Sequence, residues 1–216
     1  MLISKVSACY PIPQMRDFKA DSRRYFDRLA SRYDRHYYGR HGRQQYERVV
    51  AAAKGWKYSS VLDVGCGTGG LLAALKRPRA KLAGADISPQ MIAEAKKRLE
   101  RTADLRVADS EKLPWKRGVF DLVVSTDSLH HWPNPLQAFS EMRRVLKKGG
   151  HVVVADVTAP PVLKQVGNWF ARFGGEGDVR VYSAGELEVM LREVGFVDIR
   201  REHRSFMAVV VSGRAR

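Results

Sequence analysis

Glycines recur at close spacing in residues 61–70, which read Val-Leu-Asp-Val-Gly-Cys-Gly-Thr-Gly-Gly. Gly65, Gly67 and Gly70 match the pattern G-x-G-x-x-G between a β-branched run and a helix-like stretch. Because glycine lets the backbone turn sharply and approach a ligand closely, this loop predicts a binding site for a nucleotide-like molecule. Taken alone, the pattern suits a nicotinamide dinucleotide equally well.

Three aspartates stand where successive strands are expected to end. Asp63 lies two residues before Gly65, Asp86 ends the second expected strand, and Asp109 ends the third. Ligands of open α/β sheets bind outside the carboxyl ends of the strands, so the three carboxylates should converge on one crevice. Asp86 can accept hydrogen bonds from a ribose and Asp109 from an adenine amino group. Asp63 places negative potential where a dinucleotide would carry its pyrophosphate, which disfavours NAD and favours a sulfonium or ammonium group.

Two adjacent histidines, His130 and His131, follow the fourth expected strand. Imidazole exchanges protons near neutral pH, so either ring is a candidate base for a substrate that must lose a proton. The alternative is structural: one ring packs beneath a ligand and the other makes a fixed hydrogen bond. Asp127 is close in the sequence, but no further ligand completes a metal-binding set, and no metal site is expected.

Alternating strands and helices must position these residues. Short apolar runs predict five strands, and helical spacing predicts helices between them, one of them with Ser88 as N-cap and Pro89 in its first turn. This order is typical of a parallel sheet covered on both faces. The five strands are expected at 60–64, 81–85, 105–108, 120–125 and 151–156, with helices at 71–75, 88–99 and 136–146.

The two ends of the chain follow different patterns. Residues 16–54 show helical spacing that Gly39 and Gly42 should interrupt. Near the other end, Ser183 and Glu186 form a capping box before a helix that closes at Gly195. Runs at 196–202 and 206–212 then predict two strands whose link is too short for a parallel crossover. The sheet should therefore be mostly parallel, with an antiparallel hairpin at its C-terminal edge.

Composition narrows the class of protein further. The 216 residues contain 44% hydrophobic and 28% charged side chains and only two cysteines, a balance that excludes extended disorder, collagen and a disulfide framework. The net charge is +15, and the first 55 residues carry 12 basic against 5 acidic side chains. Such a surface suits binding of RNA or of an anionic molecule. The alternative is an ordinary solvent-exposed basic surface with no specific partner. No apolar run is long enough for a membrane span or a secretory signal, so a cytoplasmic protein is expected.

The motifs in this order resemble the class I S-adenosylmethionine-dependent methyltransferases, and most of all their type 11 group, which is similar to ubiquinone/menaquinone-biosynthesis enzymes. The resemblance covers roughly residues 20–212 and implies a Rossmann-like, doubly wound α/β fold with a seven-stranded sheet and an N-terminal helical cap. The matching segments are Asp63-x-Gly65-x-Gly67-x-Gly69, Gly84-Ala-Asp86-Ile-Ser88, Ala108-Asp109-Ser-Glu111, Phe120–Ser125, Leu129-His-His-Trp132 and Leu146-Lys-Lys-Gly-Gly150.

The resemblance also implies a cofactor, S-adenosylmethionine, a product, S-adenosylhomocysteine, and roles by position. Gly65 and Gly67 would approach the methionine part through their backbone. The other expected contacts are Asp86 with the ribose, Ile87 with the adenine ring, Asp109 and Ser110 with the adenine amino edge, and Ser125 and Tyr33 with the methionine end. Tyr33 begins a Tyr-Asp pair typical of the family's cap, although simple helix packing explains it equally well.

The chain is expected to divide into a cap at 1–55 and a cofactor-binding domain at 56–216, with residues 158–182 as a flap over the acceptor. Trp169, Phe170 and Phe173 would give this flap an aromatic face, and arginines of the cap could dock an anionic acceptor. The favoured function is methyl transfer to a small molecule. The alternatives are a methyltransferase that acts on RNA or protein, a nicotinamide-dependent oxidoreductase and a non-enzymatic cofactor-binding protein.

Overall fold

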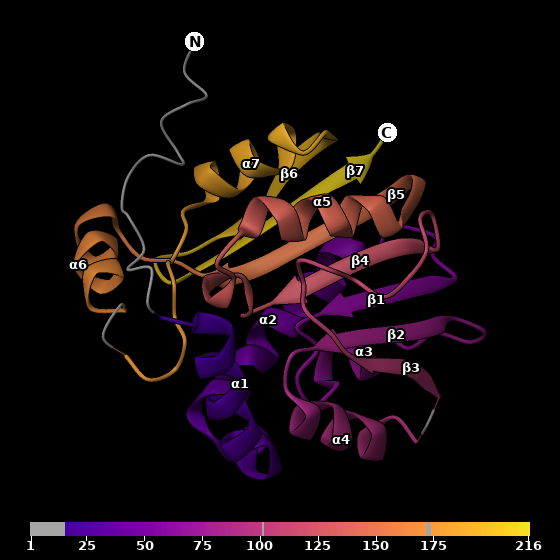
Figure 1. Cartoon of the computed structure of the whole chain (residues 1–216). Helices are drawn as coiled ribbons and strands as arrows, with labels where there is room; N and C mark the ends of the chain where they lie inside the picture. The colour runs from indigo at the N-terminus through magenta and orange to yellow at the C-terminus, as the bar shows by residue number, and fades with distance from the viewer. Residues whose placement is uncertain (1–15, 101, 172–173) are drawn as a thin grey trace.

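A seven-stranded sheet forms the centre of the molecule in the computed structural model, which describes residues 16–100, 102–171 and 174–216 (Figure 1). The strand order is β3-β2-β1-β4-β5-β7-β6. The first five strands pair in parallel, and β7 pairs antiparallel with both β5 and β6. The strands are β1 Ser60–Val64, β2 Lys81–Asp86, β3 Ala103–Val107, β4 Phe120–Thr126, β5 Leu146–Val157, β6 Phe196–Arg204 and β7 Ala208–Ala215. The predicted mostly parallel sheet with an antiparallel C-terminal hairpin is confirmed.

Helices cover both faces of this sheet. On one face α5 and α7 pack through residues such as Phe139 and Leu187, and on the other α2, α3 and α4 pack through residues such as Val49, Leu72 and Ile92 (Figure 1). The helices are α1 Phe18–Leu29, α2 Tyr37–Ala53, α3 Gly70–Ala74, α4 Pro89–Arg98, α5 Pro135–Val145, α6 Pro161–Ala171 and α7 Ala184–Glu193, with short 3-10 turns η2 Ala30–Arg35 and η3 Leu129–His131.

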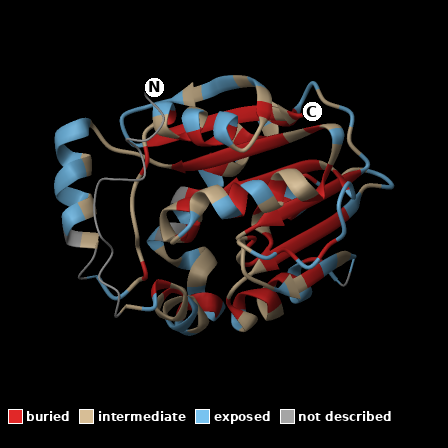
Figure 2. Cartoon of the chain, turned by 45° about the horizontal axis from the view of Figure 1, so that its top comes forward, coloured by how far each residue is buried: buried red, intermediate tan, exposed pale blue. Residues whose placement is uncertain are grey.

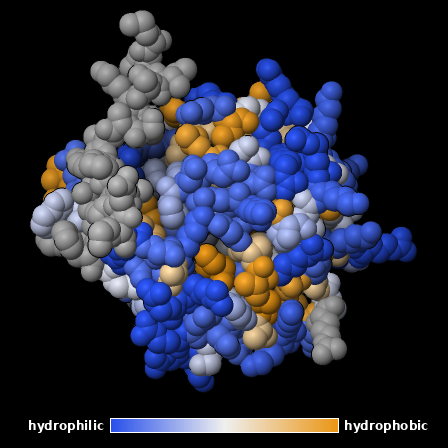
Figure 3. All heavy atoms as spheres, viewed as in Figure 1, coloured by the Kyte–Doolittle hydropathy of each residue, from blue (hydrophilic) through white to orange (hydrophobic). Residues whose placement is uncertain are grey.

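The central strands are buried on both sides, as their continuous apolar sequences predict (Figure 2). Every residue of β1 is buried, and successive side chains alternate between the two cores: Val61 lies in one and Leu62 in the other. The outer faces of the helices carry the charge, and the face seen in Figure 3 is mostly hydrophilic. Among the described residues, no helix combines the length and hydrophobicity that a membrane span needs.

Two predicted element boundaries were wrong. Gly39 and Gly42 lie inside α2, and the helical run is interrupted instead at His36, whose backbone is extended. A β-carbon on Gly39 would come within 2.8 Å of the Asp34 Cα, so this glycine allows α2 to pack tightly on the preceding turn. The fifth strand begins at Leu146 and includes Gly149 and Gly150, because the Phe120 end of β4 already pairs with Leu146.

The N-terminal helices close over one end of the sheet through three polar contacts. The Ser88 hydroxyl donates to Asp27 Oδ1 at 2.6 Å, and the Thr68 hydroxyl donates to Asp34 Oδ1 at 2.9 Å. Lys19 Nζ lies 2.7 Å from Asp109 Oδ2. These contacts tie α1 and η2 to the start of α4, to the glycine loop and to the loop after β3. Residues 1–15 of the expected cap lie outside the described residues, and the division at residue 55 stays a prediction.

The capping box at α7 also anchors α6. Ser183 N and Oγ donate to Glu186 Oε2 at 2.8 and 2.7 Å, while Lys164 Nζ and an Arg180 nitrogen each lie 2.5 Å from Glu186 carboxylate oxygens. Burial raises the pKa of Glu186, but the contacts with Lys164 and Ser183 lower it more, to about 2. The carboxylate therefore stabilises the fold above its ordinary pKa of 4.5, and this contribution is lost as the pH falls from about 4.5 to 2.

Replacing Glu186 with alanine is expected to lower the free energy of unfolding by about 1–2 kcal/mol at pH 7, because a helix cap and two cationic side chains lose their partner. Urea unfolding followed by circular dichroism measures this loss. Glu188→Ala in the same helix is the matched control, since Glu188 forms an exposed ion pair with Arg201 and should cost well under about 1 kcal/mol. Equal losses in the two variants would contradict the assigned role of Glu186.

Candidate active site

The glycine loop between β1 and α3 turns through left-handed backbone. Gly65, Gly67 and Gly69 have φ angles of 78°, 50° and 79°, a region that side chains other than glycine rarely adopt. The backbone N–H groups of Gly65 and Cys66 donate to the Ala85 carbonyl, which fixes the loop against β2. A β-carbon added at Gly67 would meet no atom within 4 Å, so the backbone here faces open space. The loop is thus shaped to admit a ligand.

A cavity of about 890 Å³, open to solvent, lies at the carboxyl end of the parallel strands. We call it the first cavity. The described cap contributes α1 and η2 side chains to its wall, including Lys19, Phe26 and Tyr33. Eight of the predicted site residues line it: Tyr33, Gly65, Gly67, Asp86, Ile87, Asp109, Ser110 and His131.

Four other predicted site residues do not line this cavity. Gly69 caps α3 and contacts the α4 helix, and His130 belongs to a neighbouring cavity. The buried Ser125 hydroxyl donates to the Val64 carbonyl at 2.7 Å and so joins β4 to β1. Asp63 is buried in β1, and its Oδ1 has no hydrogen-bond partner among the described residues. Burial, reinforced by Asp86, raises the pKa of Asp63 to about 8. A cationic ligand nearby would stabilise its charged form.

Asp86 and Asp109 present their carboxylates at the ends of β2 and β3. Asp86 accepts from Gly67 N at 2.8 Å and Ser88 N at 2.9 Å, and each oxygen keeps a lone pair for a ligand. Burial raises the pKa of Asp86 to about 6, although these two N–H groups lower it. Asp109 accepts from Glu111 N at 2.9 Å and pairs with Lys19. The open face at Gly67 and the lone pairs of Asp86 fit an adenosyl ligand, and the buried carboxyl of Asp63 near Asp86 favours a positive charge on that ligand.

A second cavity of about 690 Å³ adjoins the first. The two share Phe26, Tyr33, Asp127 and His131, which therefore form the boundary between them. The remaining wall of the second cavity consists of His130, Val157, Glu176, Asp178 and Val181. The expected flap at 158–182 thus contributes its last part to this wall.

The aromatic part of the expected flap lies elsewhere. No described residue of α6 lines either cavity, and Trp169 is 55% exposed. Figure 2 shows α6 at the side of the molecule, with much of its surface exposed. Phe173 lies outside the described residues. The arginines of the cap line neither cavity, and Lys19 is the one basic residue among the described lining residues of the two.

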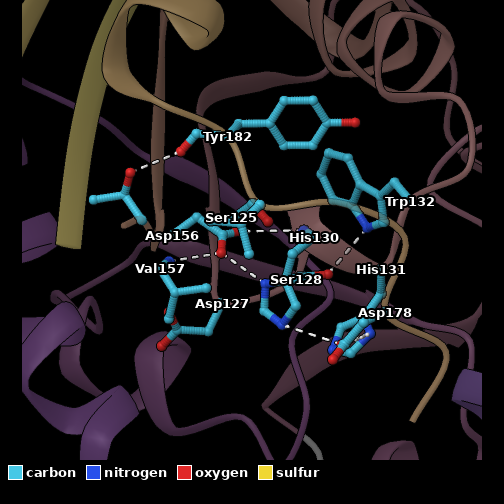
Figure 4. A network of polar contacts seen from close by, with 12 residues as sticks. Ser125, Asp127, Ser128, His130, His131, Trp132, Asp156, Val157, Asp178 and Tyr182 are labelled. Carbon is cyan, nitrogen blue, oxygen red and sulfur yellow. Dashed lines mark hydrogen bonds and ion pairs between the residues drawn. The ribbon is translucent and has the colours of Figure 1, made fainter. Parts of the chain in front are cut away.

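His130 and His131 form a polar network with two aspartates (Figure 4). His130 Nδ1 lies 2.6 Å from Asp156 Oδ1, and its Nε2 lies 3.9 Å from Asp178 Oδ1. His131 Nδ1 lies 3.1 Å from the same Asp178 oxygen. One ligand atom from each of His130, His131 and Asp178 lies within 4.8 Å of the others. Two imidazoles and one carboxylate therefore converge at one point of the second cavity.

The two imidazoles differ in their affinity for protons. Burial lowers the pKa of His130, but the Asp156 carboxylate raises it more, to about 9. Burial and the neighbouring His130 lower the pKa of His131 well below its ordinary value, so this ring is neutral. Burial and the nearby Asp156 raise the pKa of Asp127 to about 7. The network can accept a proton and can stabilise a positive charge.

The sequence did not predict several of the residues that line the two cavities. Tyr46 and Phe26 follow ordinary helical spacing, and Lys19 is one of many basic residues in the cap. Asp156 ends an apolar strand, which is the same signal that identified Asp86. No pattern singles out Asp178, because it lies in an irregular segment that the backbone bonds from Val179 N and Arg180 N to the His130 carbonyl, 2.8 and 3.2 Å long, hold beside the histidines.

The Rossmann-like sheet, the glycine loop and the carboxylates at the strand ends define the class I methyltransferase architecture. Residues 62–154 match the family described as a methyltransferase domain, type 11. A ubiquinone/menaquinone biosynthesis C-methyltransferase, UbiE, of Desulfotalea psychrophila is 31% identical over 208 residues, which cover 84% of each chain. The chain belongs to the class I S-adenosylmethionine-dependent methyltransferases of type 11, and it is an enzyme of that class. This membership decides against the nicotinamide-dependent alternative.

The chain is also similar to a second methyltransferase in sequence and to a third in structure. A malonyl-[acyl-carrier protein] O-methyltransferase of Geobacter sulfurreducens is 40% identical over 132 residues, which cover 58% of this chain and 48% of that protein. The chain therefore spans about half the length of that relative. The crystal structure of a SAM-dependent methyltransferase from Thermotoga maritima superimposes with a TM-score of 0.72 at 21% identity, covering 90% of this chain and 100% of that one. This likeness supports the fold.

Proposed function

We propose that the enzyme binds S-adenosylmethionine in the first cavity and transfers its methyl group to a small molecule held in the second. The observation that carries this proposal is the shared wall of Phe26, Tyr33, Asp127 and His131 between the two cavities. A methyl donor and an acceptor on either side of that wall would be neighbours. In-line displacement requires such proximity above all, because the donor is already activated.

Particular residues would hold the cofactor. The backbone at Gly65 and Gly67 would contact its methionine part, Asp86 its ribose and Ile87 its adenine ring. Asp109 and Ser110 would meet the adenine amino edge, and Tyr33 would close the site from the cap. Asp63 would act through its buried negative charge, and Ser125 and Gly69 would support the strand and the helix on which the other groups stand.

The cofactor supplies a methyl group on a positively charged sulfur. The enzyme contributes position, exclusion of water and a path for the acceptor's proton. His130 Nε2 is the proposed proton acceptor, because Asp156 at 2.6 Å holds its other nitrogen and fixes the ring. Neutral His131 would be a hydrogen-bonding partner for the acceptor at the boundary of the two cavities.

The named relatives methylate different acceptors, at carbon in UbiE and at oxygen in the malonyl-[acyl-carrier protein] enzyme, so they support the reaction type and leave the acceptor open. The second candidate is transfer to RNA or protein, which the net charge of +15 favours. Against it, nearly all of the described basic side chains lie outside both cavities. A small-molecule acceptor is therefore the preferred proposal.

Calorimetric titration of the full chain with S-adenosylmethionine, S-adenosylhomocysteine and NADH tests the proposed cofactor. Micromolar binding of both adenosyl ligands and no binding of NADH are expected, because the carboxylates suit a sulfonium and repel a pyrophosphate. Mass spectrometry of the purified protein first excludes cofactor that remains bound from expression. Absence of binding by both adenosyl ligands would refute the assignment of the first cavity.

A further inference from the structure

The second cavity is acidic, although the chain as a whole carries a net charge of +15. Among its nine described lining residues, three are carboxylates, two are histidines, and none is lysine or arginine. From this lining we propose that the methyl acceptor is an amine that binds as its ammonium ion. The proposal rests on the proposed function and adds its substrate class. It also reverses the expectation of an anionic acceptor, which rested on arginines that lie outside the cavity.

Asp127 is placed to receive the positive charge at the boundary with the cofactor. It follows β4 in left-handed backbone, with a φ angle of 46°, a conformation that non-glycine residues adopt at a cost. Its polar contact among the described residues is weak: Gln45 Nε2 lies 3.5 Å from its Oδ1. A buried carboxylate with so little compensation favours a cation beside it. The His130 imidazolium, which lines the cavity, and Arg48, which does not, also act on Asp127.

Asp178 receives the charge from the opposite wall. Its Oδ1 lies 3.1 Å from His131 Nδ1, a buried ring nitrogen without a well-aligned hydrogen-bond partner among the described residues. The His130 Nε2 lies 3.9 Å from the same oxygen, which is too far for a hydrogen bond. Burial raises the pKa of Asp178, and His130 lowers it; Glu176, Asp156 and Arg16 also act on this carboxylate. An ammonium ion at this point would donate a hydrogen bond to the Asp178 carboxylate.

Aromatic rings complete the wall toward the cap. Phe26 stands edge-to-face with His131 at 5.1 Å and with Tyr33 at 6.4 Å between ring centroids. Rings next to carboxylates are the surroundings in which proteins bind organic cations, because the π face of a ring is negative. The wall therefore suits an ammonium ion attached to an apolar body.

Methyl transfer to an amine needs a proton acceptor, and His130 supplies it. The ammonium ion gives one proton to His130 Nε2, and the freed lone pair on nitrogen attacks the methyl carbon of the cofactor. The N–C bond forms as the C–S bond breaks, and the electron pair of that bond stays on sulfur, which becomes a neutral thioether. The product is a methylated ammonium ion, and the imidazolium of His130 returns its proton to solvent.

A divalent metal ion is the competing occupant of the same cluster, since His130, His131 and Asp178 could ligate one. The distribution of charge favours the amine. Asp127 and Glu176 lie in the cavity wall outside this three-residue cluster, so carboxylates extend beyond the reach of a single ion. Negative charge spread along an aromatic-lined cavity suits an extended organic cation better.

Two sets of probe molecules test which charge the cavity selects; within each set the hydrocarbon part is similar and the functional group differs. The first set is 2-phenylethylamine, 2-phenylethanol and phenylacetate. The second is cyclohexylmethylamine, cyclohexylmethanol and cyclohexanecarboxylate. Each is titrated calorimetrically into the full chain saturated with S-adenosylhomocysteine, and methylation with S-adenosylmethionine is read by mass spectrometry. The amines are expected to bind roughly tenfold or more tightly than the alcohols, and at least one should gain a methyl group on nitrogen. The carboxylates should bind least.

Asp178→Asn should weaken amine binding roughly 30-fold and leave S-adenosylhomocysteine binding unchanged, because only the second cavity loses a charge. The matched control is Asp198→Asn, at an exposed aspartate of β6 that pairs with Arg214. Tighter binding of a carboxylate or alcohol would overturn the proposal. So would the absence of binding by both amines at about 10 mM, or micromolar zinc binding that His131→Ala abolishes. In each case retained S-adenosylhomocysteine binding separates this failure from failure of the proposed cofactor.

Discussion

Replacing Asp86 with asparagine is expected to weaken S-adenosylhomocysteine binding roughly 10- to 100-fold, the range for a hydrogen bond to a charged group that is lost from a buried site. The carboxylate ends β2, lines the first cavity and already accepts from the Gly67 and Ser88 amides. Its charge is available to a ligand but disfavoured by burial, which raises its pKa to about 6. Calorimetric titration of the variant with S-adenosylhomocysteine measures the effect.

The same substitution should change stability little. The neutral amide removes a buried charge, but its NH2 group faces one of the two backbone N–H groups, which loses its acceptor; these two effects have opposite sign and amount to about 1 kcal/mol each. Thermal unfolding of the unliganded variant is therefore expected within a few degrees of the parent protein. Asp198→Asn should alter neither binding nor melting. Unchanged ligand affinity in the Asp86 variant would remove this residue from the proposed site.

Catalysis by a deprotonated His130 predicts a rate that rises with pH. Because Asp156 raises the pKa of His130 to about 9, against the lowering effect of burial, the imidazole is protonated at neutral pH. Below pH 9 the active fraction grows tenfold per unit, so kcat should rise with a slope near one and level off above about pH 9. Steady-state rates from pH 6.5 to 10 at saturating cofactor and acceptor measure this profile.

Two variants assign that profile to His130. Asp156→Asn removes the charge that raises the pKa, so the midpoint should move downward by roughly one unit or more while an active enzyme remains. His130→Gln should lower kcat by roughly 10²- to 10⁴-fold and remove the His130 step from the profile. His151→Gln is the control, since His151 stacks on Trp56 away from both cavities. A midpoint that Asp156→Asn leaves unmoved would mean that another group, such as the acceptor itself, titrates.

The capping box of Ser183 and Glu186 is a feature that the local sequence is sufficient to predict. Both halves of the box form as predicted, because each contact joins residues three apart within one helix turn. The Ser88 cap and the continuous apolar strands succeed for the same reason. Gly39 and Gly42 show the limit: their propensity predicted a break, and tertiary packing kept them inside α2.

The first cavity was largely predictable because strand order carries its carboxylates. Once β1, β2 and β3 lie parallel, their ends must meet at one edge, so Asp86 and Asp109 meet there without further information. Position in the sequence did not reveal which residues near the strand ends line the first cavity. Ser125 and Asp63 stand at the same edge, yet both are buried and neither lines the cavity.

The sequence by itself determined the fold, the methyltransferase class and the main polar residues at the strand ends of the first cavity, because periodicity, caps and glycine spacing act locally and the sheet then aligns them. Tertiary structure alone decided the character of the second cavity. Asp156 and Asp178 reach His130 from residues 26 and 48 positions away, and Phe26 reaches His131 from the cap. No periodic pattern links such distant residues, so their convergence, and with it the acidic lining, depends on how the loops pack.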